Sequence, residues 1–268
     1  MLKKSLFTFI TRAINSSGSV LLSLVLAIYF SSDGIGTYMI AIAVLLGVNM
    51  LARYGSDLYL LKNCSIHYID KNFSSFKSEI ISSIKFVLCS ASICSVFIFI
   101  ISLYVVYFEE NLRLGVLLSV FSFIIPLLCF LTQISTLFKS ILKPELAPFF
   151  EFNFSSFILS IVISILFYFN YEISLNFVAV IHLVIIFVLL VVGILTLYVV
   201  DNRIFTAKLL KVSPALKPNK ELTDMFVPSF MHYIIQWGTL LIIGILATES
   251  DVGVYSVAHR VSFLVKVK

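Results

Sequence analysis

Residues 177–200 read FVAVIHLVIIFVLLVVGILTLYVV, a run of 24 residues that contains no Asp, Glu, Lys or Arg. A helix needs roughly 20 consecutive apolar residues to cross the hydrocarbon core of a bilayer, because its backbone rises only about 1.5 Å per residue. The run therefore predicts a transmembrane helix. Its one histidine, His182, is expected to be buried and hydrogen-bonded inside the protein.

The rest of the chain repeats this pattern, with apolar runs of similar length separated by short polar stretches. The 268 residues are 60% hydrophobic and only 12% charged, whereas soluble domains carry about twice that charge density. We expect an all-α, polytopic transmembrane bundle of about seven complete helices with no soluble domain, and the start of an eighth helix over residues 252–268. The expected spans are Leu6–Phe30, Thr37–Leu61, Ile80–Phe108, Leu114–Phe138, Pro148–Phe169, Phe177–Val200 and Met225–Thr248.

The basic residues of the loops predict the orientation, because Lys and Arg accumulate on the cytosolic side of membrane proteins. One side of the predicted bundle carries 12 of them and the other side only Arg113, so we expect a cytosolic N-terminus. The first helix is expected to stay uncleaved, since no small-residue cleavage site follows it. The basic residues of the predicted cytosolic side are Lys3, Lys4, Lys62, Lys71, Lys77, Lys139, Lys143, Arg203, Lys208, Lys211, Lys217 and Lys220.

Two stretches are similar to each other, SDGIGTYMIA at residues 32–41 and SDVGVYSVA at residues 250–258. We expect each to be an external turn, with a glycine where the chain reverses and a tyrosine at the membrane interface. Outer turns often look alike, but a true repeat would make the seventh helix the start of a second six-helix unit. The predicted domains are then residues 1–200, a first six-helix bundle, residues 201–224, a cytosolic linker, and residues 225–268, the start of a second, incomplete bundle.

Polar residues inside the expected spans are candidates for a binding site, because a charge at mid-bilayer costs roughly 2.5–3.5 kcal/mol. They form stripes at helical spacing, which suggests a shared water-filled cavity. Its excess of basic residues favours an anionic ligand. The candidate substrate-binding residues are Arg12, Asn15, Arg53, Asp57, Lys85, His232 and Gln236.

Each candidate also has a structural interpretation. Arg53 and Asp57 are spaced to neutralise each other as an i,i+4 pair. Arg12 and Lys85 lie near the predicted cytosolic surface, where their side chains can reach lipid headgroups. The polar residues of the seventh span can serve as hydrogen bonds between helices, namely His232 and Gln236.

The chain lacks the motifs of soluble catalysis, including a P-loop, HExxH and GxSxG, and no acid, base and nucleophile occur at a plausible spacing. We therefore expect no enzyme activity, no cofactor and no metal site. The four cysteines are expected to be small apolar fillers rather than disulfides. Glu151, near the cytosolic end of the fifth span, is expected to be solvated.

Several motifs together resemble polysaccharide (O-antigen) flippases of the Wzx type, in the multidrug/oligosaccharidyl-lipid/polysaccharide exporter superfamily. They are the opening helix with Arg12, SDGIGTY at residues 32–38, ARYGSD at 52–57, the loop FKSILKPELA at 138–147, and Pro228 followed by SDVGVYSVAHR at 250–260. The resemblance runs along the whole chain.

The resemblance implies a transporter of twelve to fourteen helices in two bundles. Such a protein moves undecaprenyl-diphosphate-linked sugar repeat units across the bacterial inner membrane. Its partners would be the lipid-linked oligosaccharide and membrane lipids, with a proton or sodium gradient as candidate driving force and no nucleic acid. This chain ends earlier, and we expect it to be truncated. The alternatives are a drug or cation antiporter, a membrane-bound polymerase or glycosyltransferase, and a non-functional remnant.

Overall fold

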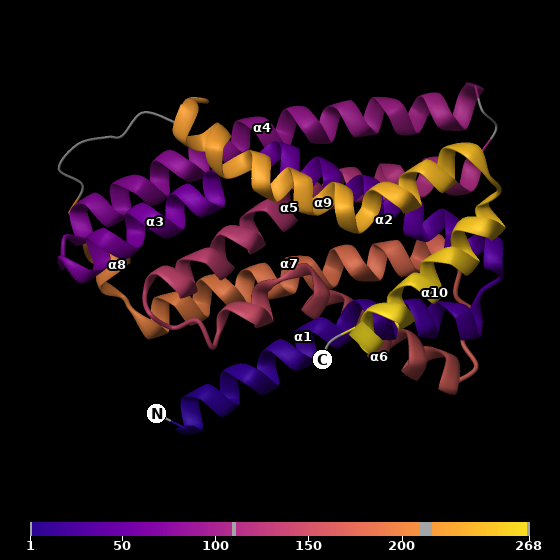
Figure 1. Cartoon of the computed structure of the whole chain (residues 1–268), viewed down its shortest axis with the longest axis horizontal. Coiled ribbons are helices and arrows are strands. Elements are labelled where there is room, and N and C mark those ends of the chain that lie inside the picture. Colours follow the sequence, from indigo (N-terminus) through magenta and orange to yellow (C-terminus); the bar gives the residue numbers. More distant parts are fainter. Residues whose placement is uncertain (1, 109–110, 209–215, 267–268) are drawn as a thin grey trace.

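The computed structural model describes residues 2–108, 111–208 and 216–266, and every regular element in these ranges is a helix. The predicted all-α class is therefore confirmed. The helices run back and forth roughly parallel to one long axis, as Figure 1 shows. They are α1 Leu2–Tyr29, α2 Ser32–Arg53, α3 Ser56–Ile69, α4 Phe73–Phe108, α5 Leu112–Ser140, the 3₁₀ turn η1 Ala147–Phe150, α6 Phe152–Tyr168, α7 Leu175–Val200, α8 Arg203–Thr206, α9 Lys220–Leu246 and α10 Glu249–Lys266.

Six helices of the described part are long and apolar enough to cross a membrane, namely α1, α2, α4, α5, α7 and α9. The protein is thus a membrane protein by the length and composition of its helices. The fifth expected span is shorter than predicted, because α6 has only 17 residues and is about 25 Å long. Its predicted first turn is the separate 3₁₀ turn η1, and Glu151 between them has an extended backbone (φ −115°, ψ 157°).

The second expected span, Thr37–Leu61, is not one helix. It breaks at Tyr54 and Gly55, whose φ angles of 41° and 76° lie in the left-handed region. The break packs against the start of α9. The ring of Tyr54 stacks on that of Phe226, with 4.6 Å between the ring centres. A Cβ on Gly55 would lie 2.6 Å from the carbonyl oxygen of Leu222. After the break, α3 continues beside the first half of α4.

The motif at residues 32–38 is not a turn but the first two turns of α2. The Ser31 hydroxyl accepts a hydrogen bond from the Gly34 amide, and Asp33 lies in the first turn, where a negative charge is stabilised by the helix dipole. The second copy likewise opens α10, with Asp251 accepting from the Thr248 amide. Tyr38 is also not at an interface, because its side chain is completely buried.

The glycines of the two motifs serve close packing instead of chain reversal. A Cβ on Gly36 would overlap the carbonyl oxygen of Glu249, and a Cβ on Gly253 would overlap that of Ser32. The two helices therefore cross with their backbones in contact, as small residues permit in membrane helix pairs. The Ser250 hydroxyl donates to the Ser32 hydroxyl at 2.8 Å beside the crossing. We call this contact of α2 with α10 the glycine crossing.

His182 forms the polar centre of the first helices. Its Nδ1 lies 3.2 Å from the Tyr38 hydroxyl of α2, and its Nε2 lies 3.0 Å from the Ser155 hydroxyl of α6. All three side chains are fully buried. The expectation that His182 is buried and hydrogen-bonded is thus confirmed, and its two bonds hold α7 against α2 and α6.

A second polar cluster joins helices at the opposite end of the bundle from the glycine crossing. The Asp201 carboxylate, just after α7, accepts from Arg203 at 2.7 Å and from the Tyr68 hydroxyl of α3 at 3.0 Å. These donors hold the pKa of Asp201 below its ordinary value. The Arg203 guanidinium also lies 4.7 Å from the ring centre of Phe73, at the start of α4.

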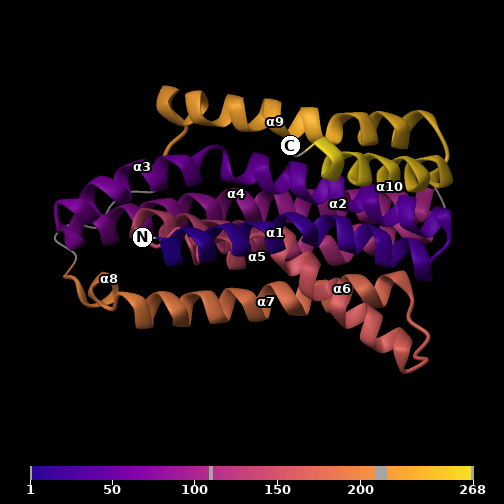
Figure 2. The ribbon, with the colours of Figure 1, turned by 60° about the horizontal axis from the view of Figure 1, so that its bottom comes forward.

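The last two long helices lie beside the others. Figure 2 shows α9 along one edge of the molecule with α10 next to it, and α7 along the opposite edge. α9 contacts α2, α3 and α10. Of its 18 most apolar consecutive residues, however, only 6% are buried inside the protein. The predicted linker 201–224 contains α8 and the start of α9, while its residues 209–215 lie outside the described ranges.

The glycine crossing makes a prediction about stability. In Gly36→Ala the new methyl group meets backbone atoms that cannot move independently, and overpacking of this kind costs about 1–3 kcal/mol. We expect a clearly lower midpoint of thermal unfolding in detergent. The control is Gly238→Ala on α9, where the nearest atom to a new Cβ is a side-chain methyl of Ile234 at 3.3 Å. An unchanged midpoint in Gly36→Ala would show that the helices do not cross this closely.

Candidate functional site

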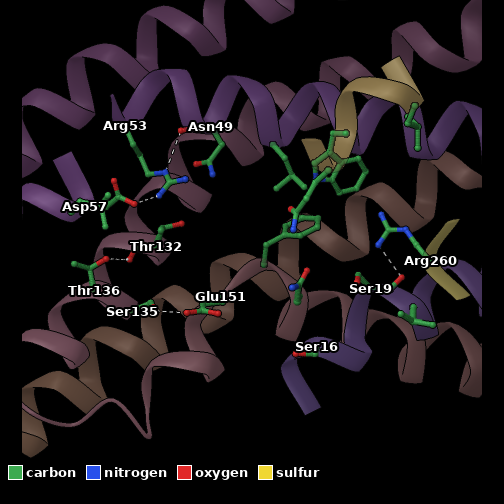
Figure 3. Close-up of a pocket in the computed structure, with 18 of the residues that line it drawn as sticks. Ser16, Ser19, Asn49, Arg53, Asp57, Thr132, Ser135, Thr136, Glu151 and Arg260 are labelled. Atoms are coloured by element: carbon green, nitrogen blue, oxygen red, sulfur yellow. Dashed lines mark hydrogen bonds and ion pairs between the residues drawn. The ribbon is translucent and has the colours of Figure 1, made fainter. Parts of the chain in front are cut away.

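A cavity of about 580 Å³ opens at the surface between two groups of helices. One wall comes from α1, α2, α3, α5 and the start of α6, and the other from α9 and α10 (Figure 3). Its volume lies within the usual range of ligand pockets, about 300–1,000 Å³. The lining is rich in hydroxyl and amide groups, including those of Ser16, Ser19, Asn49, Thr132, Thr136 and Gln236.

Arg53 and Asp57 form an ion pair on the wall of this pocket. Nη1 of Arg53 lies 2.5 Å from Oδ2 of Asp57, and Nε of Arg53 donates to the carbonyl oxygen of Asn49 at 3.3 Å. The two side chains are 15% and 20% exposed. The pair spans the break between α2 and α3, so it forms across the left-handed residues and not along one continuous helix. The geometry matches the structural interpretation, in which each residue neutralises the other.

Glu151 is the second carboxylate of the pocket, and it is only partly solvated, contrary to the expectation. Its Oε2 accepts from Nδ2 of Asn15 on α1 at 2.7 Å. Its Oε1 accepts from the Ser135 hydroxyl at 3.1 Å and from Nζ of Lys139 at 2.8 Å, both on α5. The extended backbone before α6 places the carboxylate between α1 and α5. No local sequence pattern predicts this cluster, because the residues that contact Glu151 lie 12 to 136 positions from it along the chain.

Arg260 is the third basic residue of the pocket and the one without an ion pair among the described residues. Its guanidinium lies 4.8 Å from the ring centre of Trp237, and its Nη1 donates to the carbonyl oxygen of Ser19 at 3.2 Å. Figure 3 shows Arg260 beside Ser19, on the opposite side of the pocket from Arg53 and Asp57. Three basic side chains and two carboxylates therefore line the cavity, which leaves one positive charge in excess when His259 is neutral.

The structure gathers only some of the predicted residues. Arg53, Asp57 and Gln236 line the pocket, and Asn15 reaches it through its bond to Glu151. Three candidates do not line the pocket and are exposed on the surface of their helices, namely Arg12, Lys85 and His232. The sequence analysis assigned no role to Arg260. The local feature that could have suggested a polar face there is Ser256, one helical turn before Arg260.

The arrangement is suited to a polar anionic ligand. A guanidinium that stacks on an aromatic ring keeps its outer N–H groups available for bidentate bonds to phosphate or carboxylate oxygens. The hydroxyl and amide side chains can bond the hydroxyl groups of a sugar. Within the described residues, no three His, Cys, Asp or Glu side chains lie close enough together to hold one metal ion, so these residues contain no typical transition-metal site.

No family model, curated protein or solved structure matches this chain. The interpretation of the site therefore depends on its own residues and their geometry.

The Arg53–Asp57 pair predicts a pattern of stability. Either single variant, Arg53→Ala or Asp57→Ala, leaves a mostly buried charge without its partner, and breaking such a pair costs up to about 3–5 kcal/mol. The double variant Arg53→Ala/Asp57→Ala removes both charges and should recover most of the loss. The yield of monodisperse protein in size-exclusion chromatography measures this. A loss in the double variant equal to the sum of the two single losses would mean that the two side chains act independently.

Proposed function

We propose that this protein is a transporter, not an enzyme, and that it moves an undecaprenyl-diphosphate-linked oligosaccharide across the bacterial inner membrane. The supporting observation is the cationic excess of the pocket, carried by Arg260. The pocket provides the two things that such a headgroup needs: a positive charge for the diphosphate and neutral polar groups for the sugars. O-antigen or another surface polysaccharide repeat unit is the proposed cargo.

The physical need for such a pocket follows from the cost of moving a diphosphate through hydrocarbon. An unpaired ion in an apolar medium is so unfavourable that an unassisted crossing is negligible. A cavity inside a helix bundle replaces the lost water with fixed donors. The lipid tail can stay in the bilayer beside the bundle, because only the headgroup requires the polar path.

Arg260 is better suited to this role than the predicted Arg53. The charge of Arg53 is already balanced by Asp57, and that of Lys139 by Glu151. An incoming anion would have to compete with these carboxylates. At Arg260 the neighbouring groups are an aromatic ring, a backbone carbonyl and the sulfur of Met39, so a phosphate would add the missing negative charge without displacing one.

The proposed orientation in the membrane, and with it the direction of transport, follows from the distribution of basic residues. The bundle end opposite the glycine crossing carries Lys62, Lys77 and Lys139. By the positive-inside tendency this end faces the cytosol. The cargo would then enter from the cytosolic side, where lipid-linked repeat units are built, and leave on the periplasmic side.

A drug or cation antiporter of the same superfamily is the alternative, and the pocket charges disfavour it. A cationic drug would need a free carboxylate, yet Asp57 and Glu151 each have a basic partner. A remnant without transport activity is the other alternative, and the experiment below distinguishes it by activity.

The test uses proteoliposomes with fluorescently labelled undecaprenyl diphosphate and a membrane-impermeant quencher. Wild-type protein should speed up the exchange of the lipid between leaflets. Arg260→Ala should slow that exchange about 10- to 100-fold, because a hydrogen-bonded charge contributes about 1.5–3 kcal/mol. Arg260→Lys should keep part of the rate, since it preserves the charge but not the bidentate geometry.

The matched control is Arg12→Ala, which removes an exposed arginine that does not line the pocket. Its rate should stay within about twofold of the wild type. If both arginine variants lose the same fraction of the rate, the effect reflects overall charge and the assigned role of Arg260 is wrong. If the wild-type protein gives no exchange at all, this chain is not a flippase by itself.

A further inference from the structure

The pocket is closed toward the end of the bundle that holds the glycine crossing, which we call the crossing end (Figure 1). On α2 and α10 the lining residues nearest to that end are Leu46 and Ser256, whereas the two helices begin at Ser32 and Glu249. At the opposite end the lining reaches Lys139, next to the last residue of α5. Buried apolar side chains fill the space between the pocket and the crossing end, among them Ile35, Met39, Ile42 and Val252.

One carboxylate joins three helices at the crossing end. Glu249 is the first residue of α10, and its Oε2 accepts a hydrogen bond from the Thr37 hydroxyl of α2 at 2.6 Å. Its Oε1 accepts from Nδ2 of Asn111, the residue that caps the start of α5, at 2.7 Å. Hydrogen bonds to a charged oxygen are short and about twice as strong as neutral ones. The two bonds therefore fix the start of α10 to both α2 and α5.

The partners of Glu249 distinguish it from the two carboxylates of the pocket. Asp57 and Glu151 each contact a basic side chain. Among the described residues Glu249 forms no ion pair, and its donors are a neutral hydroxyl and a neutral amide. Separating a buried ion pair strands two charges. Separating Glu249 from its donors leaves one charge, which water can solvate because the residue is partly exposed at the end of the bundle. This contact can therefore open at a lower cost than the ion pairs.

We infer that Glu249 seals the pocket at the crossing end. Its carboxylate holds α10 against α2 and α5, and beside it the two backbones touch, since a Cβ on Gly36 would overlap the Glu249 carbonyl oxygen. While the two bonds are intact, a molecule in water at the crossing end cannot reach Arg260 or the hydroxyl groups of the lining. When they break, the start of α10 loses its charged anchor and can move away from α2 and α5, which opens the pocket at this end.

The seal itself follows from these contacts, whereas its part in transport rests on the proposed function. A headgroup that enters from the opposite end has to leave at the crossing end, and the bonds of Glu249 are the ones that must open for that step. Glu249 would then control the exit of the cargo, while Arg260 binds it.

The experiment measures from which side of the membrane the pocket can be reached. Ser19→Cys on α1 places a thiol in the half-buried part of the lining. A membrane-impermeant sulfonated maleimide is added to right-side-out and to inverted membrane vesicles. Mass spectrometry of the peptide with position 19 gives the labelling rate, so the four native cysteines stay in place. A separate Glu172→Cys variant, in the exposed turn before α7, marks the side of the crossing end.

With Glu249 in place, position 19 should react slowly from the side of the crossing end and faster from the opposite side. Glu249→Gln keeps the shape of the side chain but removes the charge that accepts both bonds, so the closed state loses part of its advantage. We expect the rate from the side of the crossing end to rise about tenfold. The rate from the opposite side should stay within about twofold, which a general loosening of the fold would not allow.

The matched control is Asp251→Asn, the same type of change two positions further along α10. Asp251 accepts from the amide and hydroxyl of Thr248, just before the helix, and these bonds reach neither α2 nor α5. This control should keep the slow rate from the side of the crossing end. If Glu249→Gln does not fold, Thr37→Val is the second variant, because it removes one donor at nearly constant volume, and it should also raise that rate.

Three results would overturn the seal. The first is equal labelling of position 19 from both sides while Glu249 is still present. The second is a rate from the side of the crossing end that stays slow in both Glu249→Gln and Thr37→Val. The third is an equal rise in Asp251→Asn, since that would assign the effect to the start of α10 in general.

This design separates the two proposals, because the labelling uses no lipid substrate. A chain that exchanges no lipid but is labelled from one side only retains the seal and loses the transport function. A chain that exchanges lipid and is labelled equally from both sides retains the transport function and loses the seal.

Discussion

A charged side chain inside a lipid-embedded helix bundle must be paired or hydrated, and this constraint organises the charges of the pocket. Arg53 is paired with Asp57, and Lys139 with Glu151, each across a place where the helical backbone is interrupted. These interruptions, at Tyr54–Gly55 and at Glu151, let side chains of different helices meet. Arg260 alone among the pocket's charged residues has only an aromatic ring and uncharged acceptors as neighbours. The chemistry that we propose follows from that difference.

The sequence was informative where a property depends on composition and weak where it depends on tertiary contacts. Long apolar runs predicted the helices, and the isolation of His182 in such a run predicted its burial. The break after Arg53 was missed because tyrosine rarely adopts a positive φ, so ARYGSD reads as a continuous helix. The motif at residues 32–38 was mistaken for a turn, since a serine, an acidic residue and a glycine also suit a capped helix start.

The candidate site shows the same division. Polar spacing along single helices identified Arg53 and Asp57 as neighbours. It failed for Arg12, Lys85 and His232, because a stripe of polar residues does not say which side of a helix faces the protein. It also could not find Glu151 with Asn15, which are 136 positions apart, or Arg260 with Ser19, which are 241 apart. Contacts at such separations depend on how the helices are placed, and no local pattern encodes that.

The glycine crossing ties the positions of its two helices to each other. Gly36 meets the backbone four residues before Gly253, and Gly253 meets the backbone four residues before Gly36. This is an isologous contact, the kind that two identical subunits make around a two-fold axis. A larger side chain at either glycine therefore meets the backbone of the other helix in the same way, and neither helix can relieve the overlap without moving the other.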